Sequence, residues 1–374
     1  MQNTGKHFIF CFFIIVVFIA SGCKKTDIIS TTLNVRKNVT ALTPQEKADF
    51  VNAIKLLKQT TSPYDANINY YDQFVKWHYE AFYCDGSGMM LGYPAHMNPA
   101  FLPWHRSYLQ IFENALSTVS GKNILIPYWD WTDPSSLNVV FADDFMGGFG
   151  NAANGYVVET GPFRQGQWEV KITDYLNIDS VKLDIYPPIN ANPDLIRAES
   201  IFKTGTVSLP KNSDLLRCLN VPTYDCYPWD SSSDTLQSFR NTLEGWRGSL
   251  GNICTNNNMD VDNPTGRTSA MHNVVHLYVG GVFPLAGGGY GEGNMAQNTS
   301  PNDPVFWIHH ANIDRIWTGW MNRHGRVYLP ENNGPMQSNL NDVMEPFSFR
   351  TDGKNTPKSM LYETDLGYRY DVLP

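Results

Sequence analysis

The chain has 374 residues, of which 42% are hydrophobic and 13% aromatic, and this composition suffices for a large buried core in one or two globular domains. Its net charge is −8 at pH 7 and it contains no run of basic residues, which argues against a nucleic acid as partner.

The first 22 residues have the features of a targeting segment. Lys6 and His7 precede an apolar run over residues 8–20, which is too short to cross a bilayer as a mature helix. The following Ala-Ser-Gly-Cys resembles the lipobox of bacterial lipoproteins, and this implies a lipidated Cys23 as the mature N-terminus. The protein is then an extracytoplasmic, membrane-anchored lipoprotein. The alternative is an ordinary secretory signal with an incidental cysteine.

A polar tether is predicted next, so that residues 1–22 form the signal peptide, 23–40 the lipidated cysteine and tether, and 41–374 the folded domain. Thr43 and Pro44 are typical of a helix start, and the pattern predicts a helix to residue 59. Helical patterns also fit 67–83, 103–118, 234–248, 268–279 and 304–324. Asn302 and Asp303 before Pro304, and Gly325 after the last turn, bound the final helix.

Long stretches between these helices, at 132–200 and 203–232, are rich in Gly, Pro, Asn and Asp and are expected to be irregular. The glycine-rich segment 286–294 is predicted to be a flexible loop and not a phosphate-binding loop, because no strand leads into it and no helix follows at once. The sequence therefore predicts a mainly helical single domain with long loops and little β structure.

Four cysteines besides Cys23 remain in the mature chain: Cys84, Cys218, Cys226 and Cys254. An extracytoplasmic location permits disulfides, and three pairings of four cysteines are open, including closure of the short loop between Cys218 and Cys226. A Cys-x-x-Cys pair is absent, so thiolate zinc and thioredoxin chemistry have no support.

Eight histidines remain after removal of the signal segment, and most lie in aromatic-rich helical patterns. His272 and His276 are four residues apart, so that both imidazoles lie on one helix face and suit one metal ion. Two prolines between His96 and His105 place His96 in a loop and His105 near a helix start. Buried imidazoles need partners, and neutral nitrogen ligands without thiolates suit copper or zinc between facing helices.

Two longer patterns carry a resemblance to a known family. "HMNPAFLPWHRSYLQIFE" (96–113) and "DPVFWIHHANID" (303–314) are similar to the two copper signatures of the tyrosinase family, the type-3 dicopper proteins. The likeness extends through "IPYWDWT" (126–132), "FRNTLEGWRG" (239–248), "HNVVHLYVGG" (272–281), Arg36 and the pair Tyr368 and Tyr370. It covers about residues 35–372 and implies a central four-helix bundle that holds a dicopper site, with 41–374 as the catalytic domain.

The resemblance also implies the copper ligands. The first copper ion would be held by His78, His96 and His105, and the second by His272, His276 and His310. His309 would then point about 100° away from its neighbour on the helix and serve as a supporting or packing residue. Asp314 and Arg106 are candidates for orienting the ligand rings, with a structural ion pair as the alternative.

In this family a water held by a glutamate and an asparagine is proposed to take the phenol proton, which is general-base work. Asn273 matches the asparagine and Glu244 the glutamate, but residues 249–270 separate the two here, whereas they lie much nearer in bacterial relatives. A buried structural carboxylate is therefore the alternative for Glu244. Position 94 is proline, so a short-range cysteine–histidine thioether is absent, while a link from Cys84 to His96 stays open.

The resemblance implies a dicopper phenol oxidase that uses O2 to hydroxylate monophenols and to oxidise o-diphenols to o-quinones. One alternative is a catechol oxidase without the first activity. Another is a haemocyanin-like oxygen carrier, although carriers block phenol access with an extra domain or subunit. A zinc hydrolase is disfavoured, because dinuclear hydrolytic sites usually include carboxylate ligands.

Overall fold

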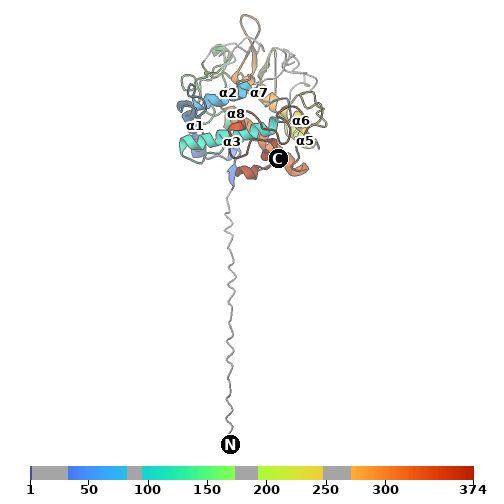
Figure 1. The fold of residues 1–374 in the computed structure, drawn as a ribbon. Coiled ribbons are helices and arrows are strands. Elements are labelled where there is room, and N and C mark those ends of the chain that lie inside the picture. The colour runs from blue at the N-terminus through green and yellow to red at the C-terminus, as the bar shows by residue number, and fades with distance from the viewer. Residues whose placement is uncertain (2–32, 82–94, 173–192, 247–270) are drawn as a thin grey trace. The chain divides into compact units, whose positions relative to one another are not determined.

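A computed structural model of the chain describes Met1 and residues 33–81, 95–172, 193–246 and 271–374. Helices dominate these residues and strands are few, which confirms the predicted fold class (Figure 1). The α-helices are α1 (Pro44–Gln59), α2 (Tyr70–Glu80), α3 (Phe101–Ser120), α4 (Pro134–Val140), α5 (Asn212–Leu219), α6 (Phe239–Glu244), α7 (Met271–Gly280) and α8 (Val305–His324).

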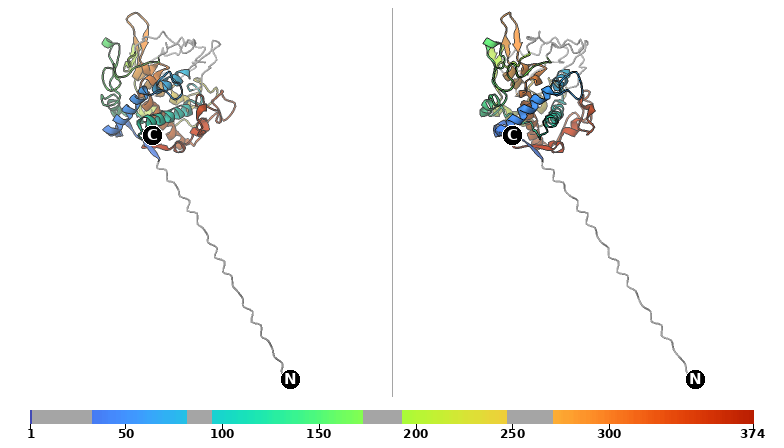
Figure 2. Two further views of the ribbon diagram at one scale, coloured as in Figure 1. Left: turned by 60° about the vertical axis from the view of Figure 1, so that its left-hand side comes forward. Right: turned by 90° about the vertical axis from the view of Figure 1, so that its left-hand side faces the viewer.

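Helices α3 and α8 form the centre of the fold. Every residue of α8 from Val305 to Met321 is buried, which is typical of a helix enclosed on all sides by protein. Helix α3 packs against both α8 and α1, and α7 packs against α8 (Figures 1 and 2). Helix α2 packs against α1 and against the short 3₁₀ turn Ser300–Asn302 that precedes α8. The four helices α2, α3, α7 and α8 thus surround a common interior.

Helix α1 begins where its capping signal predicts, and α8 ends at the glycine predicted to follow its last turn. Thr43 and Glu46 form a reciprocal capping box, in which each side chain accepts a hydrogen bond from the other's backbone N–H, and α1 starts at the following Pro44. Helix α8 ends before Gly325, whose φ of +94° lies in the left-handed region that favours glycine. These local signals fix the ends of α1 and α8.

The folded part begins earlier than residue 41, which corrects the predicted domain boundary. Strand β1 (Asn34–Arg36) pairs in parallel with β6 (Tyr368–Tyr370), and the side chain of Arg36 is fully buried. Backbone hydrogen bonds to β6 hold this segment against the domain, because an extended strand satisfies its N–H and C=O groups within the fold only beside a partner strand. Residues 1–22 and Cys23 lie outside the described part apart from Met1.

A small sheet corrects the prediction for the glycine-rich segment. Its strands are arranged in the order β3 (Gly205–Thr206), β2 (Ile201–Phe202), β4 (Val282–Pro284) and β5 (Tyr290–Glu292). Segment 286–294 therefore forms the turn and second strand of the β4–β5 hairpin, and a strand does lead into it. Gly288 and Gly289, at φ of +90° and +81°, supply the turn, because residues with a Cβ rarely adopt such angles.

The two stretches expected to be irregular contain α4 and α5, so that prediction was also too broad. Cys218, on α5, and Cys226 are free thiols, and the short loop between them is not closed by a disulfide. Cys84 and Cys254 lie outside the described residues. Within the described ranges, none of the helices combines the length and apolar character that a bilayer span requires.

Candidate metal centre

Two groups of histidines converge between helices α2, α3, α7 and α8. In each group, one ring nitrogen from every residue lies within 4.8 Å of those of the others. The first group contains His78 on α2, His96 before α3 and His105 on α3; the second contains His272 and His276 on α7 and His309 and His310 on α8. The structure thus brings the six predicted ligands together as two triads and adds His309 to the second. His324 stands apart, with Nε2 2.8 Å from the Leu219 carbonyl oxygen.

The two groups adjoin one another. The rings of His105 and His310 stack with centroids 4.3 Å apart and an interplanar angle of 13°, and the rings of His96 and His272 are 6.4 Å apart. Phe306 packs on rings of both groups, at 4.0 Å from His310 and 5.0 Å from His78. Two metal ions bound by these groups would therefore be neighbours, in surroundings that exclude bulk water.

Hydrogen bonds to oxygen atoms set the orientation of four rings. Because these oxygens only accept, each Nδ1 carries the hydrogen and each Nε2 is left with a lone pair for a metal. The Nδ1···O distances are 2.7 Å from His78 to Asn298 O, 2.8 Å from His105 to Phe101 O, 2.7 Å from His276 to Met295 O and 2.7 Å from His272 to Asn273 Oδ1.

The second group shows why a cation fits. The Nε2 atoms of His272, His276 and His310 lie 3.1–3.3 Å from one another. Lone pairs at this separation repel unless a proton or a cation lies between them, and metal–imidazole bonds of about 2.0–2.1 Å allow one ion to contact all three nitrogens. The donor set of neutral imidazoles, with no thiolate or carboxylate among the described members of either group, suits copper.

Burial keeps these imidazoles neutral. Desolvation lowers the pKa of every histidine in both groups, to about 3 for His105 and to about 4 for His276. Metal binding requires unprotonated nitrogen, and near neutral pH a metal ion therefore meets ligands that have no proton to release.

His309 differs from its neighbour in its hydrogen bonding. Its Nδ1 lies 3.1 Å from the indole Nε1 of Trp131, and an indole N–H can only donate. Nδ1 of the neutral His309 ring is therefore the acceptor, and Nε2 carries the hydrogen. Nε2 is buried and has no hydrogen-bond partner among the described residues. This geometry favours His310 as the metal ligand of the adjacent pair, and the ligand assignment itself stays a prediction.

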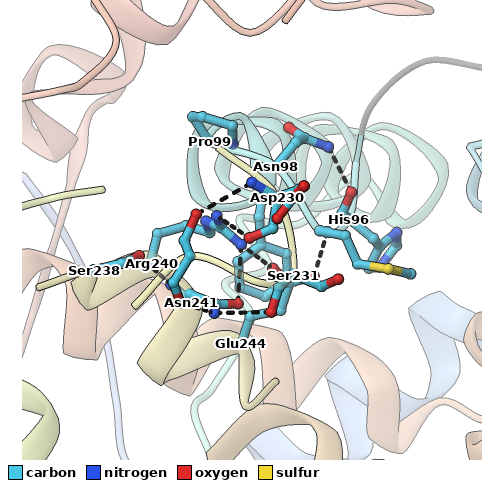
Figure 3. A network of polar contacts seen from close by, with 12 residues as sticks. His96, Asn98, Pro99, Asp230, Ser231, Ser238, Arg240, Asn241 and Glu244 are labelled. Atoms are coloured by element: carbon cyan, nitrogen blue, oxygen red, sulfur yellow. Dashed lines mark hydrogen bonds and ion pairs between the residues drawn. The ribbon is translucent and has the colours of Figure 1, made fainter. Parts of the chain in front are cut away.

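Glu244 is the last residue of α6 and is fully buried. Its Oε1 accepts the backbone N–H of Met97 at 2.6 Å, and its Oε2 lies 3.1 Å from Nη1 of Arg240 (Figure 3). Arg240 in turn pairs with Asp225 through two hydrogen bonds of 2.8 and 3.1 Å. Burial raises the pKa of Glu244, and the nearby Arg240 opposes this without cancelling it.

Asn273 lies beside the second group. Its Oδ1 accepts from His272, and its Nδ2 is buried without a partner among the described residues. The backbone oxygen of Glu244 is 3.3 Å from the same His272 Nδ1. The long separation of Glu244 and Asn273 in sequence therefore does not keep them apart in space, because both border His272.

Asp314 and Arg106 join helices α8 and α3 in a buried ion pair, with Nε–Oδ1 at 2.5 Å. The remaining partners of Asp314 are Arg36 and the hydroxyls of Tyr368 and Tyr370. None of the hydrogen bonds described for this carboxylate reaches a histidine ring. The structural alternative is therefore favoured over a role in orienting the ligands.

Sequence reasoning missed the contacts that support the histidines. Trp131 lies 178 positions from His309, and Met97 lies 147 positions from Glu244. Asn298 and Met295 contribute backbone oxygens, which leave no mark on residue identity. Trp131 lies within a motif noted for its family likeness, but nothing in that motif indicates its partner.

Comparison with known proteins agrees with this centre. The model of the common central domain of tyrosinase matches residues 68–323, a range that includes both histidine groups. Tyrosinase from Streptomyces antibioticus is 35% identical over 344 residues, which cover 91% of this chain and 100% of that protein. Grixazone synthase from Streptomyces griseus is 34% identical over 358 residues, which cover 91% of this chain and 99% of that protein.

A solved polyphenol oxidase from Thermothelomyces thermophila superposes with a TM-score of 0.58 over 92% of this chain and 90% of that one, at 19% identity, and shares the fold. The sequence relatives and the matched domain confirm a copper-dependent oxidoreductase whose cofactor is a pair of copper ions. The chain belongs to the tyrosinase family of type-3 copper phenol oxidases.

Proposed function

We propose that this enzyme hydroxylates monophenols at the ortho position and oxidises o-diphenols to o-quinones with O2. The observation that carries the proposal is the pair of adjoining imidazole triads, neutral and buried apart from the partly exposed His276, between the same helices. In this proposal the ligands of the first copper ion are His78, His96 and His105, and those of the second are His272, His276 and His310. The copper pair supplies the electron transfer that closed-shell phenols need to react with O2.

The chain contributes a base for the phenol proton. Asn273 offers a buried N–H donor, and Glu244 offers a carboxylate whose pKa is raised by burial, so that a water between them can accept a proton from a phenol. Each carboxylate oxygen of Glu244 accepts one described hydrogen bond and retains capacity for another. In the overall reaction one monophenol and one O2 give one o-quinone and one water.

A catechol oxidase that lacks the hydroxylation step is the alternative. Relatives of nearly equal identity include both a tyrosinase and a grixazone synthase, so identity alone does not select the substrate. A haemocyanin-like carrier shares the same kind of metal site and is the more distant alternative.

Oxygen uptake by the copper-loaded protein, given a monophenol with a trace of diphenol as primer, tests the proposal. We expect sustained uptake, with one O2 consumed per monophenol. The copper-free protein is the control and should consume none. Uptake with catechol but not with the monophenol would establish the catechol oxidase and remove the proton-accepting role of Glu244 and Asn273. No turnover of either substrate, with two copper ions bound and O2 bound reversibly, would favour the carrier.

We also propose that the protein is an extracytoplasmic lipoprotein, anchored to a membrane by lipid on Cys23. The support is the charged start, the apolar run over residues 8–20 and the lipobox-like residues before Cys23. Expression of the full chain in a bacterium with an alkyne-labelled fatty acid should label the wild type and not Cys23→Ser. Unlabelled wild-type protein, released in soluble form, would favour the ordinary secretory signal.

A further inference from the structure

Met97 follows the predicted ligand His96 and has an unusual backbone conformation. Its φ is +56°, in the left-handed region that residues with a Cβ rarely adopt. Such a conformation persists only where the surrounding structure imposes it, and it often accompanies a functional site. The direction in which His96 leaves the chain depends on this backbone, because the two residues share a peptide bond.

The carboxylate of Glu244 supplies the constraint. Its Oε1 accepts the N–H of that shared peptide at 2.6 Å, from the amide of Met97. The carboxylate is itself fixed from the other side, because Oε2 pairs with Arg240 (Figure 3). Arg240 is in turn held by Asp225. All three of these charged side chains are 0% exposed, so the contact is shielded from competing water.

Neighbouring contacts hold the same segment at other points. The side-chain amide of Asn98 donates to the carbonyl oxygen of His96 at 2.6 Å, and the hydroxyl of Tyr224 donates to the carbonyl oxygen of Pro99 at 2.6 Å. These bonds fix both flanks of Met97. The only hydrogen bond described for the Met97 N–H itself is the one to Glu244.

We propose that Glu244 is a positioning residue for His96, which holds Met97 in its left-handed conformation and so directs the imidazole toward His78 and His105. The ring centroid of His96 lies 4.8 Å from that of His78 and 4.9 Å from that of His105. The role rests on the proposed function, in which these three rings bind the first copper ion. It differs from the base role, because it requires an acceptor oxygen at Oε1 and no change of protonation.

Copper binding by the full chain separates the two roles. The measurement is copper stoichiometry by elemental analysis, together with Cu(I) affinity from competition with a chromophoric chelator. Glu244→Leu removes the oxygen that accepts the Met97 N–H. We expect the first copper ion to bind ~10–100-fold more weakly, which is the usual effect of losing a partner that orients a metal ligand. The second copper ion should bind as in the wild type. Adding Met97→Gly should restore most of that affinity, because glycine adopts the required φ without a constraint.

Glu113→Leu is the matched control. Glu113 is also a buried carboxylate, and its Oε2 accepts both Arg36 Nε and the Ile126 N–H at 2.9 Å. This variant should lose stability but bind both copper ions with wild-type affinity. Unchanged copper affinity in Glu244→Leu would overturn the proposal, and so would a loss that Met97→Gly does not repair, because Glu244 would then act by another route.

A second pair of variants leaves the Glu244 network intact and serves if Glu244→Leu does not fold. Met97→Ile should lower the affinity for the first copper ion about 10-fold, because a β-branched residue is least compatible with this φ. Met97→Gly should bind that ion at least as tightly as the wild type. Equal affinity in all three proteins would overturn the proposal. Failure of the proposed function is read separately, because a wild-type chain that binds two copper ions but does not hydroxylate monophenols would overturn that function and leave the positioning role standing. A wild-type chain that does not bind two copper ions would overturn both.

Discussion

Replacement of Asp314 by asparagine tests how much the buried charge network contributes to the fold. The carboxylate accepts from Arg106 at 2.5 Å, from Arg36 at 3.3 Å and from the hydroxyls of Tyr368 and Tyr370 at 2.6 and 2.5 Å. These donors come from α3, β1 and β6, so one side chain on α8 joins the beginning and the end of the folded chain to its centre (Figure 1).

The expected loss follows from what remains after the charge is removed. Arg36 keeps Glu113 at 2.9 Å, but Arg106 keeps only uncharged oxygens, those of Met360, Thr318 and the backbone of residue 314, and both guanidinium groups are 0% exposed. Removing one partner of a buried ion pair costs about 3–5 kcal/mol. With an unfolding entropy of about 2.1 cal/mol/K per residue over roughly 340 residues, Tm should fall by about 4–7 °C.

Thermal and urea unfolding of the copper-free protein, followed by circular dichroism, measure this loss. Asp365→Asn is the control, because Asp365 is exposed and its replacement should change the free energy of unfolding by no more than about 0.5 kcal/mol. A loss below about 1 kcal/mol for Asp314→Asn would refute the reasoning, since it would mean that the buried arginines do not need this partner.

The pH dependence gives an independent check. Burial acts to raise the pKa of Asp314, but Arg106 and Arg36 outweigh it and the net pKa is lowered. A carboxyl with a lowered folded pKa stabilises the fold above its unfolded pKa of about 3.9 and loses this contribution as pH falls through the folded value. The difference between wild type and Asp314→Asn should therefore be full near neutral pH and shrink below about pH 4.

Two further predictions concern the histidines. His310→Ala should bind one copper ion per chain by elemental analysis, and His309→Ala should still bind two, because Trp131 keeps the hydrogen of His309 on Nε2; the opposite result would contradict this assignment. Burial lowers the pKa of His105 to about 3 and of His276 to about 4, against about 6.5 when unfolded, so the unfolded copper-free chain binds more protons below that pH. The free energy of unfolding in urea should therefore fall from pH 6.5 toward pH 4, by up to about 1.4 kcal/mol per pH unit for each histidine. An unfolding free energy that stays constant over this range would be inconsistent with neutral buried rings.

Helices with strong end signals could be predicted closely, and short ones could not. Helix α1 begins and ends as predicted, but α6 covers only Phe239–Glu244 of the expected 234–248, because Ser238 caps its start and Gly245, at φ +99°, ends it. Helices α4 and α5 have 7 and 8 residues, too few for a periodic pattern to stand out from their loop-like composition. The small sheet could not be predicted for a related reason, since strands of two or three residues are too short to show an alternation of apolar and polar residues.

The convergence of the candidate histidines could be predicted from the sequence, but the contacts that support them could not. Histidine spacing and the long motifs indicated which imidazoles belong together, and the structure brings these six together and adds His309 to the second group. The acceptors that set their orientation are backbone oxygens such as those of Asn298 and Met295, and backbone atoms are common to every residue type. A pairing between a carboxylate and an amide 147 positions away, as for Glu244 and Met97, depends on the tertiary fold alone.

The two triads differ in how their geometry is secured. His272 and His276 share one face of α7, and His310 lies on the rigid central helix α8, so helix periodicity alone brings most of the second triad together. In the first triad, His96 comes from a non-helical segment, and its direction depends on the left-handed Met97 beside it. The backbone of a helical ligand is held by the helix's own hydrogen bonds, whereas a loop ligand depends on tertiary contacts, and those around His96 include contacts from Glu244, Asn98 and Tyr224. The buried Glu244–Arg240–Asp225 network supplies one of these contacts, which accounts for charged side chains in a part of the core that apolar residues would otherwise fill.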